Sequence, residues 1–76
     1  MAHKILMVED DFALAMGTEY ALTSEGYAVT TAGNLAQARE KFDDSIDLVL
    51  LDVMLPDGTG FEFCKELREK NSDVPI

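Results

Sequence analysis

Two short aliphatic runs constrain the fold of this chain more than any other feature. Residues 5–8 lead directly into the acidic residues 9–11, and residues 48–51 lead directly into Asp52. Aliphatic runs of this length, bounded by polar or turn residues, are typical of strands buried on both faces of a parallel sheet. Open parallel sheets bind ligands outside the carboxyl ends of their strands, so Asp52 is a candidate for chemistry.

The segment after the first run carries the signals of a helix. Asp11 is a candidate N-cap and Gly26 a stop signal. Residues at helical spacing predict the stripe that faces the core: Leu14, Gly17, Thr18, Ala21 and Leu22.

Two further helices are predicted. One begins after Asn34, where Gln37 completes a capping-box pattern, and closes at residues 43–45; its apolar stripe is Leu35, Ala38 and Phe42. The other begins after Thr59, behind a Pro- and Gly-containing turn at residues 56–60; its stripe is Phe63, Cys64 and Leu67.

The remaining segments complete an alternating order of strands and helices. Residues 27–32 have the mixed polarity of an edge strand, and residues 74–76 look like the start of a fourth strand. The order β-α-β-α-β-α predicts half of a doubly wound α/β domain. If the first strand lies between the second and third, Glu9, Asp10 and Asp52 sit on strand ends about 5 Å apart.

The charge balance argues against two classes of partner. The 76 residues include 15 acidic and 6 basic side chains, and the net charge of -9 repels phosphate backbones and anionic membranes. We therefore expect no direct nucleic-acid binding by this segment and no membrane partner. The single cysteine cannot form an internal disulfide, and residues 5–8 are too few for a signal peptide or membrane span, so we expect a cytoplasmic location.

Three ionised carboxylates in one crevice repel one another unless a cation joins them. Mg²⁺ suits such a site, because it prefers oxygen ligands and often bridges protein acids to a phosphate. A neighbouring carboxylate can then attack the phosphoryl group and form an acyl phosphate. Asp52 is the better nucleophile. The predicted metal ligands are Glu9, Asp10, Asp52 and the backbone carbonyl of Met54.

Several residues also have a simpler interpretation than a role in metal binding or catalysis, and one alternative metal site is excluded. Acids are favoured at helix N-termini, and Asp11 is either a helix cap or a neighbour of the metal site. A calcium-binding loop counted from Asp52 fails, because Met54 and Pro56 would stand at ligand positions. Cys64, with no base or second cysteine to accompany it, is most simply a small buried residue.

Residues 5–11, 50–62 and 74–76 together carry a family resemblance. Over residues 4–76 the chain resembles the receiver domain of bacterial two-component response regulators, especially receivers attached to winged-helix DNA-binding transcription factors. The resemblance implies a flavodoxin-like α/β fold with strand order 2-1-3. It also implies that residues 1–76 are a truncated receiver domain, which lacks most of the fourth strand and everything after it.

The same resemblance implies a signalling role. Asp52 would accept a phosphoryl group from the phosphohistidine of a sensor histidine kinase, with Mg²⁺ or Mn²⁺ bound, and control transcription through an output domain absent here. The Thr or Ser and the Lys of complete receivers fall beyond Ile76, and Lys4 begins the first strand at the far end of the sheet. We expect a phosphoacceptor rather than an enzyme.

A rival interpretation follows from the strands that the resemblance implies are missing. Their absence leaves the strand at residues 48–51 as an edge with unpaired backbone groups. The chain would then be a non-switching structural or dimerisation unit that binds a divalent ion only. In either case we expect self-association through the exposed third-strand edge, by strand pairing or exchange of elements.

Overall fold

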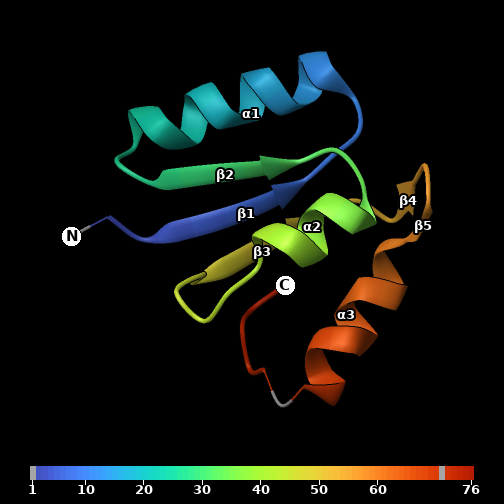
Figure 1. The fold of residues 1–76 in the computed structure, drawn as a ribbon. Helices are drawn as coiled ribbons and strands as arrows, with labels where there is room; N and C mark the ends of the chain where they lie inside the picture. The colour runs from blue at the N-terminus through green and yellow to red at the C-terminus, as the bar shows by residue number, and fades with distance from the viewer. Residues whose placement is uncertain (1, 71) are drawn as a thin grey trace.

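The computed structural model describes residues 2–70 and 72–76 and arranges them as one parallel sheet between helices (Figure 1). Its strands are β1 (Lys4–Val8), β2 (Ala28–Ala32) and β3 (Leu48–Leu51), in the order β2-β1-β3. Both neighbours run parallel to β1. This arrangement confirms the predicted α/β fold, the strand order and the edge position of the second strand.

The hydrophobic core joins the sheet to two of the three helices. α2 (Leu35–Lys41) and α3 (Gly60–Glu69) cover one face, and α1 (Phe12–Ser24) covers the other (Figure 1). The buried cluster comprises Leu6, Val8, Ala32, Leu35, Ala38, Ile46, Val49, Leu55, Phe63 and Leu67. The predicted stripes of α2 and α3 are therefore confirmed, except that Cys64 is only half-buried.

The ends of α1 agree with the sequence, but its predicted core stripe is confirmed only at Thr18 and Leu22. Asp11 caps the helix by accepting a hydrogen bond from the Leu14 backbone N–H at 3.0 Å, and Gly26 follows it with φ 94°. The half-buried positions are Ala15, Thr18, Glu19 and Leu22, whereas Leu14, Gly17 and Ala21 are exposed.

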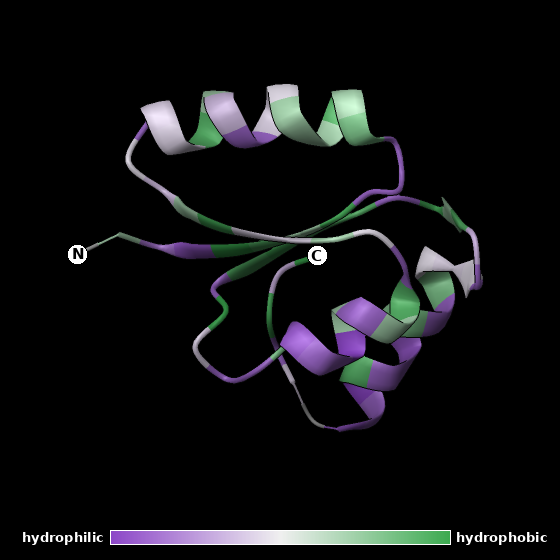
Figure 2. Cartoon of the chain, turned by 45° about the horizontal axis from the view of Figure 1, so that its top comes forward, coloured by the Kyte–Doolittle hydropathy of each residue, from purple (hydrophilic) through white to green (hydrophobic). Residues whose placement is uncertain are grey.

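The error has a physical reason. Almost every residue of α1 is apolar or small, and Glu19 is its only charged side chain, so spacing alone could not single out the half-buried face. Figure 2 shows α1 mostly in green and pale colours, while α2 and α3 carry broad purple stretches.

No helix in the described ranges is long and apolar enough to cross a bilayer.

α2 begins as predicted but ends early. The Asn34 side chain accepts from the Gln37 N–H at 2.8 Å, whereas the Gln37 side chain accepts from Gly33 rather than completing the capping box. The helix ends at Lys41, before the predicted stop at residues 43–45, because Phe42 adopts extended backbone angles. Phe42 instead packs edge-on against Phe63, with ring centroids 6.2 Å apart.

The turn predicted at residues 56–60 is a small antiparallel hairpin of β4 (Met54–Leu55) and β5 (Gly58–Thr59). Gly58 has φ 152°, which favours glycine. Thr59 then caps α3 by accepting from the Glu62 N–H at 3.3 Å, as its spacing predicted.

The final residues modify the prediction of an exposed third-strand edge. Residues 74–76 form no regular strand, so the predicted start of a fourth strand is wrong as secondary structure. Nevertheless, the Val49 N–H donates to the Pro75 carbonyl at 2.9 Å, and Val74 packs against the core. The chain therefore pairs part of the β3 edge with its own C-terminal segment.

Candidate functional site

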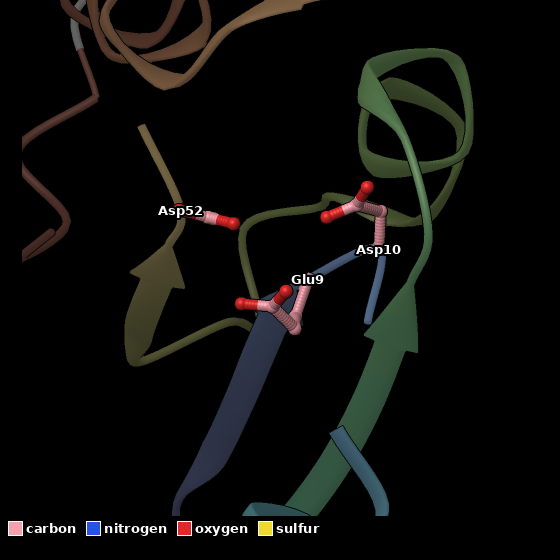
Figure 3. Close-up of side chains that lie close together, drawn as sticks. All are labelled: Glu9, Asp10 and Asp52. Carbon is pink, nitrogen blue, oxygen red and sulfur yellow. The ribbon is translucent and has the colours of Figure 1, made fainter. Parts of the chain in front are cut away.

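The ends of β1 and β3 bring together Glu9, Asp10 and Asp52, here called the acid cluster (Figure 3). The Asp52 N–H donates to the Val8 carbonyl at 3.1 Å, and the Glu9 N–H donates to the Ala32 carbonyl at 3.0 Å. These bonds extend the strand pairing by one residue and fix the acids just past the strands. Each acid offers a carboxylate oxygen, and the three oxygens lie within 4.8 Å of one another. The predicted convergence is confirmed.

Glu9 and Asp52 help to line a cavity of about 280 Å³ between α1 and the sheet. Leu14 and Thr18 line it from α1, and Met7 and Leu50 line it from the strands. Glu9 and Asp52 are half-buried in this setting, and Asp10 is exposed. The site therefore has an apolar wall on one side and access to solvent on the other.

The negative charge of the acid cluster is not offset by a basic side chain. Within residues 2–70 and 72–76, no Lys, Arg or His forms an ion pair with any of the three acids. Lys4 bonds to Ser45 at the opposite end of β1, as expected. Two unit charges 4 Å apart repel by about 4 kcal/mol at an effective dielectric of 20. An oxygen-only donor set with this charge fits a hard divalent cation such as Mg²⁺.

Asp11 directly follows Asp10 along the chain, and Met54 lies two residues after Asp52. Asp11 is a helix cap, because its carboxylate accepts from Leu14, and its own N–H donates to Glu9 Oε1 at 3.0 Å. Met54 lies in β4 opposite Thr59 with its side chain exposed. Its main-chain carbonyl is the only oxygen that it could offer to a hard cation, since its side chain carries a soft thioether sulfur.

Sequence reasoning missed the role of one residue in the loop that follows Asp52. Asp57, predicted only as a turn residue, accepts hydrogen bonds from the backbone N–H groups of Leu35 at 2.8 Å and Ala36 at 3.0 Å. These bonds hold the pKa of Asp57 below its ordinary value, and the bond from Leu35 has the largest effect. A signal existed: the first turn of α2 contains no acid of its own, although helix N-termini favour one.

Comparison with known proteins identifies the family. The response regulator receiver domain matches residues 5–76. The chain belongs to this family. The match confirms, at the level of the family, the resemblance found in the sequence. Receivers are generally phosphoacceptors rather than enzymes, and they bind Mg²⁺.

This receiver is also similar to part of a longer regulator. It is 45% identical over 76 residues to the "Uncharacterized transcriptional regulatory protein YrkP" of Bacillus subtilis. The alignment covers 100% of this chain and 32% of that protein. The chain thus spans about a third of the length of this curated relative.

Solved receivers have the same fold. The non-phosphorylated HemR receiver domain of Leptospira biflexa superposes with a TM-score of 0.92 at 35% identity, over 96% of this chain and 60% of that one. The response regulator TrrA of Thermotoga maritima, in complex with Mg(2+)-BeF, gives 0.87 at 35% identity, over 95% and 64% of the two chains. TrrA has also been solved in complex with the histidine kinase ThkA.

Proposed function

We propose that this receiver accepts a phosphoryl group on Asp52 in a reaction that requires Mg²⁺ or Mn²⁺. The observation that carries the proposal is the convergence of three carboxylate oxygens within 4.8 Å at the ends of β1 and β3. The ion is held by the acid cluster and by the main-chain carbonyl of Met54. When bound, it offsets the negative charge of the acids and of the incoming phosphoryl group.

The roles within the acid cluster follow from position. A carboxylate oxygen of Asp52 attacks the phosphorus of a phosphohistidine and forms an acyl phosphate, the phosphorus–nitrogen bond breaks, and the leaving imidazole nitrogen takes up a proton from water. Glu9 and Asp10, which follow the neighbouring strand β1, help to hold the metal ion. The hydrogen bond from the Asp11 N–H restrains the Glu9 carboxylate in its orientation.

The partner class is supported by similarity. TrrA, which shares the fold, forms a complex with a histidine kinase, and we assign a sensor histidine kinase as the phosphodonor of this receiver. YrkP is named a transcriptional regulatory protein, and we assign to this module the control of transcription through an output domain outside residues 1–76.

A phosphodonor assay tests the proposal. The chain is incubated with acetyl phosphate and Mg²⁺, and its intact mass is measured. We expect one phosphate adduct, which disappears with a chelator and in Asp52→Asn. Asp44→Asn is a matched control, because Asp44 is exposed and lies outside the acid cluster, and it keeps the adduct. An adduct that persists in Asp52→Asn contradicts the assignment of Asp52 as acceptor.

A second candidate function, a self-associating unit that binds a divalent ion only, is favoured by the edge strand. β3 has one strand neighbour in the sheet, and Leu48 and Leu50 on it are half-buried. A cavity of about 300 Å³ lies beside them and beside Ile5 and Leu22. The C-terminal segment accepts one hydrogen bond from Val49, which leaves room for further pairing.

Light scattering at micromolar concentration tests the self-association. We expect a dimer or larger species. A folded monomer contradicts self-association through β3. Mg²⁺ binding without a phosphodonor adduct would favour the second candidate over the first.

A further inference from the structure

A carboxylate outside the acid cluster fastens the loop after Asp52 to the neighbouring helix. Asp57 Oδ1 accepts from the Leu35 N–H at 2.8 Å, and Oδ2 accepts from the Ala36 N–H at 3.0 Å. N–H groups in the first turn of a helix have no partner within the helix. Asn34 satisfies only the Gln37 N–H. Asp57 therefore supplies, from 21 and 22 residues away, the cap that the start of α2 lacks.

The loop that carries Asp57 is held at other points too. Met54 pairs with Thr59, and Leu55 pairs with Gly58 and is buried in the core. Gly58 packs closely on α2, since a β-carbon there would lie 2.6 Å from Leu35 Cδ1. The hairpin formed by β4 and β5 is thus a well-defined unit, and Asp57 at its turn connects it to α2.

Met54, the predicted carbonyl ligand, lies at the base of this hairpin and two residues beyond Asp52. Because both residues of β4 are paired with β5, the attachment at the turn restrains the orientation of the main chain at the base. We infer that Asp57 is a positioning residue for the metal site: through its two hydrogen bonds to α2 it fixes the Met54 carbonyl as a ligand. This inference rests on the proposed function, and specifically on its metal site.

The test compares two caps of the same helix. Asp57→Ala removes the attachment of the hairpin. Asn34→Ala is the matched control, because it removes the other N-cap of α2 but leaves the hairpin attached. Mg²⁺ affinity is measured on the full chain by following backbone amide shifts during titration. Circular dichroism establishes that each variant is folded, and Asp57→Asn, which keeps one acceptor oxygen, serves as a milder second variant.

We expect Asp57→Ala to shift the amides of residues 53–55 without metal and to weaken Mg²⁺ binding about tenfold. Saturating Mg²⁺ should restore the phosphate adduct to the wild-type level. Asn34→Ala should bind Mg²⁺ within about twofold of wild type, and Asp57→Asn should fall between wild type and Asp57→Ala.

Three results would overturn the inference: wild-type Mg²⁺ affinity in both Asp57 variants, equal weakening in Asp57→Ala and Asn34→Ala, or no Mg²⁺ binding by the wild type. The last would also remove the metal site of the proposed function. If the wild type forms no adduct but the contrast between the variants holds, phosphoryl acceptance fails and the positioning role of Asp57 stands.

Discussion

Gly60 packs directly against the main chain of Asp52. The Gly60 N–H donates to the Val53 carbonyl at 2.7 Å, and a β-carbon added to Gly60 would overlap the Asp52 carbonyl oxygen. The first residue of α3 therefore touches the backbone of the proposed phosphoacceptor. The position of Asp52 and the packing of α3 are coupled through this contact.

The first prediction contrasts two glycines. Gly60→Ala should lower the free energy of unfolding by about 1 to 3 kcal/mol, because either α3 or Asp52 must move. Gly17→Ala should raise it by about 0.5 to 1 kcal/mol, since a β-carbon there meets nothing within 4 Å and alanine favours the helix. Urea unfolding of both variants measures the difference, and destabilisation of equal size would contradict the close contact at Gly60.

The second prediction concerns the charge of the acid cluster. Without metal, Glu9→Gln should raise the free energy of unfolding by about 1 kcal/mol, because it removes a repelling charge. With Mg²⁺, the same variant should bind the ion at least about tenfold more weakly. Asp44→Asn, away from the cluster, should change neither quantity. Unfolding and Mg²⁺ titrations in parallel measure both, and a Glu9→Gln variant that binds Mg²⁺ like the wild type would exclude Glu9 as a ligand.

The third prediction is a pH dependence. Hydrogen bonds from Leu35 and Ala36 lower the pKa of Asp57 in the folded chain, so its ionised form stabilises the fold. That contribution is complete above the unfolded pKa of about 4 and is lost as the pH falls through the folded value.

The urea midpoint of the wild type should therefore exceed that of Asp57→Asn by a constant margin between about pH 5 and pH 7, and the margin should shrink below about pH 4. Asp43, whose pKa the Ser45 hydroxyl and N–H also lower, is present in both proteins and cancels in the difference. A margin unchanged down to about pH 2 would show that Asp57 does not act through its charge.

Much of the fold and of the acid cluster was predictable because the decisive signals are local. The runs at residues 5–8 and 48–51 specify buried strands, and each ends in acids whose position needs no knowledge of distant contacts. Strand order then brings Glu9, Asp10 and Asp52 together. The N-caps at Asp11, Asn34 and Thr59 were predictable for the same reason.

The features that escaped prediction depend on tertiary contacts or on weak patterns. The cap that Asp57 provides joins residues that are 21 and 22 positions apart, and no local rule pairs them. The half-buried face of α1 was predicted only in part, because a helix that is apolar nearly all round has no periodicity to indicate one face. The contact between Val49 and Pro75 likewise depends on how the C-terminal segment returns to β3.

The central claim is that Asp52 carries the phosphoryl group. Borohydride reduces an acyl phosphate to an alcohol and so converts a phosphorylated aspartate to homoserine, which peptide mass mapping can locate. After treatment with acetyl phosphate and Mg²⁺, the account predicts homoserine at position 52, and none when the ion is chelated. Reduction at Glu9, Asp10 or another acid in place of Asp52, or at no residue at all, would contradict it.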